Sequence, residues 1–259
     1  MADILAAEWL KLRTARSTWL VLGVVAVFTA LMLAVAWYFV VTWDGLAPEL
    51  RAHAAMGSLP TLMGWLVSLI MAVFGAVAIT SECGNGMIRT TFLAMPNRAL
   101  VLFAKAVVVA GVTFVATEAS LLITLLGSAA ILGDRPIGGQ TPIDAGGLVF
   151  VIAMGLSTAT FALIGLGLGA ITRSGLATVV VLALVWYIVP LIAAHVPTPL
   201  DEWLSSLVPG ALAGQLAATG NENSVFSALL APWEAALVML TYAVVPLVLG
   251  AAALVRRDP

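Results

Sequence analysis

The residues whose side chains could support a reaction are few in this sequence, and they lie far apart. The 259 residues include one cysteine, Cys83, and two histidines, His53 and His195. Single residues of these types do not supply the Cys/His ligand set of a zinc site, and a lone cysteine cannot form an internal disulfide. We therefore expect no metal site and no resident cofactor in this chain.

Nucleotide hydrolysis is also not expected. A phosphate-binding loop needs a glycine-rich segment that ends in lysine followed by serine or threonine. The only lysines, Lys11 and Lys105, are followed by Leu12 and Ala106. No basic tract contains interleaved aromatic residues, so nucleic-acid binding has no support either. The sequence predicts a chain that is not itself an enzyme.

Glu118 is the one ionisable residue deep within a long apolar stretch. A charged carboxylate at the centre of a bilayer costs roughly 2.5–3.5 kcal/mol on insertion scales. We expect Glu118 to face other helices, to be protonated, or to accept hydrogen bonds from nearby hydroxyls. The candidate donors are Thr113, Thr117 and Thr124. A structural role as a protonated acid and a functional role in substrate binding or gating both remain open.

Composition indicates what surrounds these residues. Hydrophobic residues make up 62% of the chain and charged residues 9%, whereas soluble domains average about 45–50% and about 25%. A soluble fold of this size would expose large apolar patches. The sequence therefore predicts an integral membrane protein.

Six apolar runs are long enough to cross a hydrocarbon core of about 30 Å as helices. They cover residues 19–41, 62–80, 102–132, 148–171, 177–195 and 235–255. The runs are apolar on all sides rather than alternating, which favours helices over barrel strands. We predict one all-α transmembrane domain over 1–259. Lys11, Arg13 and Arg16 before the first run resemble a secretory signal, but the run is long enough to be an uncleaved span.

The basic residues lie unequally on the two sides of these spans. One side has nine, the other has only Arg51 and Arg135, and the second side has most of the acids. The nine are Lys11, Arg13, Arg16, Arg89, Arg98, Lys105, Arg173, Arg256 and Arg257; the acids are Asp44, Glu49, Asp134, Asp144, Asp201, Glu202, Glu222 and Glu234. Basic residues are enriched in cytoplasmic loops. We predict a plasma-membrane protein with both termini in the cytoplasm.

Residues 82–98, between the second and third runs, form the most informative segment. Gly84, Asn85 and Gly86 interrupt the span, and then Ile88, Phe92 and Met95 share one helical face. Pro96 ends this short helix because proline disfavours helical geometry in the residue before it. Such a helix either docks in a groove of a partner protein or rests on lipid headgroups. The local pattern does not decide between the two.

The order of several features resembles the permease subunits of type-2 ATP-binding-cassette (ABC) exporters. A lead, Ala7-Glu8-Trp9-Leu10-Lys11-Leu12-Arg13, precedes the first span, and an acid ends the second span. This acid is Glu82. Glycine, arginine, proline, arginine and lysine then follow it in order, as Gly86, Arg89, Pro96, Arg98 and Lys105. Together with the six spans, the resemblance covers nearly the whole chain.

The resemblance implies a partner set and a set of positions. It implies a pair of permease subunits, identical or similar, bound to two cytoplasmic ABC ATPase chains that hold ATP and Mg²⁺. Residues 1–18 would form an interfacial lead, and 196–234 short external re-entrant helices. Coupling to the ATPase would involve Glu82, Ile88, Arg89, Phe92, Met95 and Arg98. In the lead, Leu5, Trp9 and Leu12 share a face, whereas Glu8 and Leu10 interrupt the apolar pattern.

The expected function is ATP-driven export of a hydrophobic or amphipathic compound. An ion-coupled secondary transporter is the main alternative, but such proteins usually have duplicated halves and several intramembrane charges. An intramembrane serine protease using Ser157 and His195 is disfavoured, because Thr158 stands where that family has glycine.

Overall fold

The computed structural model describes residues 1–51, 53–95, 97–218 and 229–256. Pro96, Glu222 and Arg257, which entered the predictions above, lie outside the described residues. The described part is built from helices, and its one β-bridge pairs Ala55 with Gly138. The all-α prediction is therefore confirmed.

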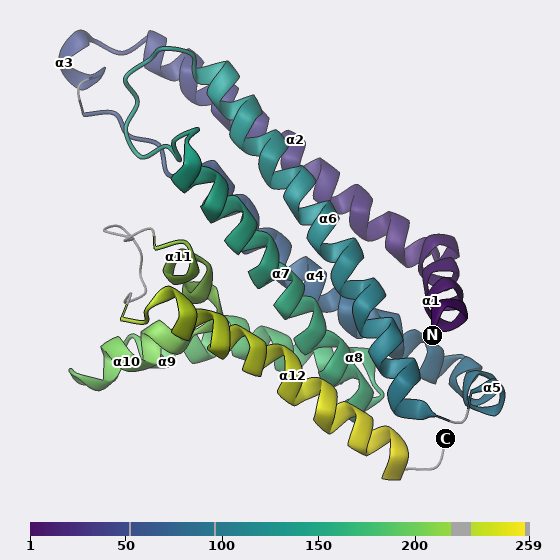
Figure 1. Ribbon diagram of the computed structural model, residues 1–259. Coiled ribbons are helices and arrows are strands. Elements are labelled where there is room, and N and C mark those ends of the chain that lie inside the picture. The colour runs from purple at the N-terminus through teal and green to yellow at the C-terminus, as the bar shows by residue number, and fades with distance from the viewer. Residues whose placement is uncertain (52, 96, 219–228, 257–259) are drawn as a thin grey trace.

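Within the described residues, six helices are long and apolar enough to cross a membrane, which confirms the six predicted spans (Figure 1). They are α2 (Arg16–Asp44), α4 (Leu59–Gly84), α6 (Arg98–Leu132), α7 (Ala145–Thr172), the segment Gly175–Ala193, and α12 (Pro232–Arg256). Each helix begins and ends within four residues of its predicted run. Two short helices lie next to the spans at one end, α1 (Ala2–Thr14) and α5 (Met87–Ala94), and α3 (Pro48–Arg51) lies at the other.

The centre of the bundle is the pair α4 and α7, which are the most buried spans. Glycines let their backbones touch. A Cβ added at Gly165 would lie 1.9 Å from the carbonyl oxygen of Ala72, and one at Gly75 would lie 1.9 Å from that of Ala162. Small residues at such contacts are common between membrane helices. These glycines therefore serve packing within the chain.

A second face of α7 packs against α12 in the same way. A Cβ at Gly167 would lie 2.4 Å from the carbonyl carbon of Pro246, and one at Gly250 would lie 2.9 Å from Ala170. With α4 on one face and α12 on another, α7 is held by close backbone contacts on both.

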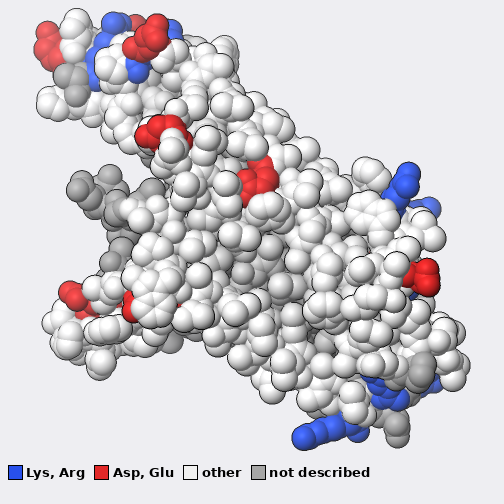
Figure 2. Space-filling model, viewed as in Figure 1, with Lys and Arg blue, Asp and Glu red and all other residues white. Residues whose placement is uncertain are grey.

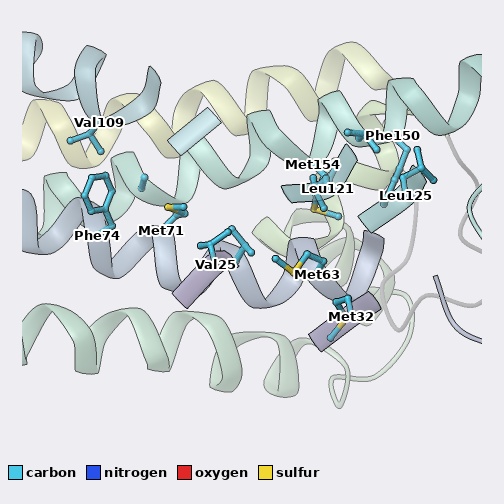
Figure 3. Close-up of a cluster of buried hydrophobic side chains, with 14 of the residues drawn as sticks. Val25, Met32, Met63, Met71, Phe74, Val109, Leu121, Leu125, Phe150 and Met154 are labelled. Carbon is cyan, nitrogen blue, oxygen red and sulfur yellow. The ribbon is translucent and has the colours of Figure 1, made fainter. Parts of the chain in front are cut away.

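Flexible side chains fill the remaining space between the helices. Met32 of α2, Met63 and Met71 of α4 and Met154 of α7 are buried in one apolar cluster (Figure 3). Methionine is unbranched and adapts to irregular gaps. This accounts for the buried methionines as packing residues.

The fifth span contains a change of helix type. It consists of α8 (Gly175–Ala183), a π-helical turn η1 (Leu184–Ile188) and α9 (Val189–Ala193). Pro190 has no N–H group and cannot complete the regular hydrogen-bond ladder, which accounts for irregularity here. Trp186 in this turn packs edge-on against Phe161 of α7, with ring centres 4.3 Å apart.

Short helices follow the fifth span, as the resemblance implied: α10 (Leu200–Leu207), η2 (Pro209–Ala211) and α11 (Leu212–Leu216). Buried Gln215 holds this segment together, since its amide nitrogen donates to the Ser206 carbonyl and its oxygen accepts from the Leu230 N–H. Tyr242 of α12 donates to the Leu207 carbonyl at 3.0 Å. The segment is thereby attached to the sixth span, and its re-entrant character stays a prediction.

On the face shown in Figure 2, most charged side chains lie toward the ends of the molecule, and few lie on the surface between them. We call the end that carries α1, α5 and the last turn of α12 the α1–α5 end (Figure 1). At the opposite end, Arg135 donates two hydrogen bonds to the Asp44 carboxylate, at 2.9 and 2.8 Å. Arg51 donates to the Asp44 carbonyl. The arginines predicted to be external thus lie together.

Candidate functional site

A sharp turn connects α4 to α5 at the α1–α5 end. Gly86 has φ = +70°, a left-handed conformation that other residues adopt only with strain. The chain reverses there and runs through α5, whose eight residues end at Ala94. Met95 is extended, with φ −136° and ψ 97°, as expected before a proline. The Asn97 side chain then accepts the Leu100 N–H and begins α6.

Four charged side chains close a ring beneath this turn. Lys105 Nζ lies 2.5 Å from Glu8 Oε2 and 2.7 Å from Glu82 Oε1. Lys11 Nζ lies 2.7 Å from Glu8 Oε1 and 3.3 Å from Glu82 Oε1. Acids and lysines alternate, so every charge has two opposite neighbours. We call these four residues the ionic ring.

The ring is inaccessible except at Lys11. Side-chain exposure is 3% for Glu8 and Lys105, 5% for Glu82 and 27% for Lys11. Buried charges are tolerated when they are paired and hydrogen-bonded, and removing one partner typically costs about 3–5 kcal/mol. Burial alone would lower the pKa of Lys11, but its hydrogen bond to Glu8 and the negative charges of Glu82 and Glu8 outweigh burial and raise that pKa.

Of the six predicted coupling residues, four contact other parts of the chain itself. Glu82 belongs to the ionic ring. Ile88 is 9% exposed and, with half-buried Phe92, packs on the apolar core of the bundle. Arg98 lies over the Phe92 ring at 5.1 Å and donates to the Leu254 carbonyl of α12. The apolar face identified in the sequence thus holds α5 against its own bundle, and half-buried Met95 lies just beyond α5.

The outer face of α5 is formed by other residues. Arg89 and Thr90 are exposed, and Leu93 is 85% exposed. Beside this face lies a pocket of about 250 Å³ between the α4–α5 turn and the turn from α7 to α8. Its lining residues are Cys83, Gly84, Gly86, Ile88, Arg89, Phe92 and Arg173. A large exposed leucine next to an arginine-lined pocket is suited to contact with another protein.

The predicted intramembrane residue Glu118 lies away from this site, in the middle of α6. Its Oε1 atom is buried, and no described residue donates a hydrogen bond to it. The carboxyl group packs against Gly155 of α7, where an added Cβ would lie 2.0 Å from Oε1. Thr113 and Thr117, two expected donors, have buried hydroxyls with no hydrogen-bond partner among the described residues, and Thr124 donates to the Ser120 carbonyl. Hydrogen bonds from these hydroxyls to Oε1, one of the three alternatives expected for Glu118, are therefore not found, whereas the contact with Gly155 fits the alternative that Glu118 faces another helix.

The pair considered for a serine protease shows no such arrangement. His195 is exposed just beyond the end of α9, and its Nδ1 atom lies 2.8 Å from the Leu191 carbonyl of that helix, whereas Ser157 is buried within α7.

Comparison with known proteins identifies the family. The profile described as "ABC-2 family transporter protein" matches residues 4–190, well over half of the chain. The chain belongs to the ABC-2 transporter family. No curated protein matches it in sequence. Members of this family are membrane components that generally work with an ABC ATPase subunit and are not catalytic themselves.

The match to the ABC-2 family covers the elements that build the ionic ring. It runs from the first turn of α1 through α5 to Pro190 in the fifth span. Three ring members, Glu8, Lys11 and Lys105, were not among the predicted site residues. The available signal was an acid on the otherwise apolar face of a short helix, together with a lysine inside the beginning of a span. Neither the acid nor the lysine, taken alone, indicates which residue of opposite charge it contacts.

Proposed function

We propose that this ABC-2 family chain is the permease subunit of an ATP-driven exporter. It pairs with a second permease copy, identical or similar, and a separate ABC ATPase binds at the α1–α5 end. Family membership supports the general assignment. The observation that carries the docking site is the exposed outer face of α5, where Leu93 is 85% exposed beside Arg89.

The α1–α5 end is cytoplasmic in this proposal, and the protein lies in the plasma membrane. Eight of the nine residues counted on the basic side fall among the described residues, and their elements meet at this end: α1, the first turn of α2, α5, the start of α6, the α7–α8 turn and the end of α12. The two remaining basic residues lie at the opposite end with Asp44. This distribution supports the orientation by the basic-residue rule.

The contacts of α5 support a route for motion from an ATPase into the permease. An ATPase that closes on ATP would press on Arg89 and Leu93. Because Ile88 and Phe92 on the inner face pack on the core, α5 would carry that displacement to the ends of α4 and α6. Gly86 provides the backbone turn about which α5 could rotate. No step requires a catalytic residue in this chain.

A hydrophobic or amphipathic cargo fits the spans. Most exposed side chains of α2 and α12 are large and apolar, including Val27, Tyr38, Leu240 and Val248. Between the two ends, Glu118 is the one ionisable residue along the spans. Such surfaces offer dispersion contacts and few hydrogen bonds, so the cargo would enter from the cytoplasm or the inner leaflet and leave outward.

The substitution Leu93→Asp tests the docking site. Leu93 is 85% exposed, so an aspartate there should leave the permease folded while placing a charge in the proposed contact. Leu50→Asp is the matched control, because Leu50 is also exposed, at 58%, but lies in α3 at the opposite end. Tagged variants are purified from native membranes in mild detergent, and the ABC ATPase is measured by mass spectrometry and by ATP hydrolysis.

We expect wild type and Leu50→Asp to retain the ATPase, and Leu93→Asp to lose at least about 90% of it, as for loss of an interface anchor. Equal retention by Leu93→Asp and Leu50→Asp would refute the docking site. Absence of any ABC ATPase from the wild-type preparation would favour an ion-coupled secondary transporter instead.

A further inference from the structure

The ionic ring connects three elements that are distant in sequence. Glu8 and Lys11 come from α1, Glu82 from the end of α4 and Lys105 from the second turn of α6. Neither α4 nor α6 could move away from α1 at this level without separating charges that are almost fully buried. The ring therefore fixes α1 to both spans that flank α5.

The same ring lies against α5. Lys11 Nζ is 3.4 Å from the hydroxyl of Thr91, which is the only residue of α5 that contacts a ring member by a hydrogen bond among the described residues. Glu82 and Lys105 line a small cavity together with Ile88 and Phe92, the two inner-face residues of α5. Glu82 is also only two residues before Gly84, where α4 ends. The inner face of α5 thus packs beside the ionic ring.

Simple attachment of α1 would not need this arrangement. One ion pair, or apolar residues such as the buried Leu12, would attach an interfacial helix, and well-packed apolar residues often replace a buried ion pair without loss of stability. A closed ring differs in one respect. Each acid is shared by two lysines, so displacement of one member leaves both of its neighbours with a single partner.

We propose that Glu8, Lys11, Glu82 and Lys105 are positioning residues that make α1 and α5 move as one unit. The ring holds α1, the ends of α4 and α6, and the inner face of α5 in a single arrangement, so displacement of α5 also displaces α1. The use of this link in transport rests on the proposed function. The link itself is a property of the chain alone.

Cys83 provides a native reporter of the position of α5. It is the single cysteine, it is partly buried, and it lines the pocket formed with Ile88 and Phe92. Its rate of alkylation by a maleimide therefore depends on how closely α5 covers it. The rate is measured on the purified chain in lipid nanodiscs, without an ATPase, and the melting temperature is measured on the same samples.

Glu8→Gln opens the ring from α1, and Asp3→Asn is its matched control. Asp3 is an exposed acid on the same helix and outside the ring. We expect Glu8→Gln to raise the Cys83 alkylation rate about fivefold or more through local opening, and Asp3→Asn to change it less than about twofold. An unchanged rate in folded Glu8→Gln would overturn the proposal.

The double variant Glu8→Gln/Lys105→Gln separates positioning from stability. It removes one acid and one base, so no buried charge is left without a partner, and the melting temperature should recover relative to Glu8→Gln. The Cys83 rate should stay high, because the ring is still open. Alkylation rates that merely follow the melting temperature across all variants would show that the ring only stabilises the fold.

Thr91→Val tests the link between α1 and α5 even if the ring variants do not fold. It removes the contact between Lys11 and α5 while leaving the four charges in place. Thr90→Val is the control, because the Thr90 hydroxyl bonds within α5 to the Met87 carbonyl. We expect faster Cys83 alkylation in Thr91→Val only; equal rates in both variants would contradict the link. Loss of ATPase binding in Leu93→Asp bears on the proposed function and leaves this result unaffected.

Discussion

Glu8 and Lys105 show how a charge can be placed inside a protein of this composition. Each has 3% side-chain exposure, yet each contacts two opposite charges. The ring has no net charge, which limits the penalty of removing it from water. Lys11 is the one member with substantial contact with solvent, at 27% exposure. It is therefore the member whose titration can be followed.

The raised pKa of Lys11 predicts a stability difference that depends on pH. Its ordinary pKa is 10.5, and the ring raises the folded value. A group with a raised folded pKa contributes stability that is complete below the unfolded pKa and is lost as pH rises through the folded pKa. Wild type should therefore melt at a higher temperature than Lys11→Met at pH 8, and the difference should shrink as pH rises above 10.5 and through the raised folded pKa. Melting curves of both proteins in detergent across this range test it, and a constant difference would contradict it.

At the level of single residues, the sequence predicted contacts poorly. Glu8 was interpreted as an interruption of the apolar face of α1, whereas its carboxylate pairs α1 with Lys105 of α6. An acid on an otherwise apolar helical face simply breaks the apolar period. The period contains no information on whether another element supplies a cation to pair with that acid. The same lack of pairing information left open whether threonine hydroxyls or a neighbouring helix would contact Glu118, which packs against Gly155 of α7.

Among the elements, α5 shows what periodicity can and cannot provide. The spacing of Ile88 and Phe92 agrees with the short helix that is observed, whereas Met95, predicted on the same helical face, is extended and lies just beyond the end of α5. Any amphipathic helix buries its apolar face, but the pattern does not state whether its own bundle or a partner covers that face. Here the chain itself covers Ile88 and Phe92, and the proposed contact with an ATPase falls on Arg89 and Leu93 of the other face.

The contact between α4 and α7 yields a prediction at the same scale. Gly165→Val would place a Cβ 1.9 Å from the Ala72 carbonyl oxygen, so the two backbones must separate. We expect destabilisation of about 3 kcal/mol or more, at or above the upper end for overpacking, because the obstructing atom is backbone. Gly111→Val is the control, since a Cβ at Gly111 of α6 meets nothing within 4 Å. Equal melting temperatures for the two variants would show that the α4–α7 contact is not tight.

For the whole molecule, the six spans were predictable because long apolar runs in lipid leave the backbone little choice but helix. The ends of each run were less certain, since caps such as Ser58 and Asn97 extend helices beyond the apolar residues. The π-helical turn in the fifth span had no clear signal except Pro190. Local hydrogen bonding determines such details, and hydropathy does not report it.

Cys83 also tests the orientation of the molecule in the membrane. It is the single cysteine and lies at the α1–α5 end. A membrane-impermeant maleimide should label Cys83 in inside-out vesicles and not in intact cells. In a Cys83→Ser/Leu50→Cys variant the pattern should reverse, because Leu50 lies in α3 at the opposite end. Labelling of wild-type Cys83 in intact cells would refute the proposed orientation.

The length of α6 has a mechanical consequence. Its 35 residues extend about 50 Å at about 1.5 Å per residue, whereas the hydrocarbon core is about 30 Å thick. One uninterrupted rod therefore passes from the aqueous phase beside α5 to the aqueous phase beside Arg135, with Lys105 near one tip. If α6 tilts as a rigid body, its two ends move in opposite directions. A displacement of one end therefore displaces the other end across the bilayer without any helix having to unfold.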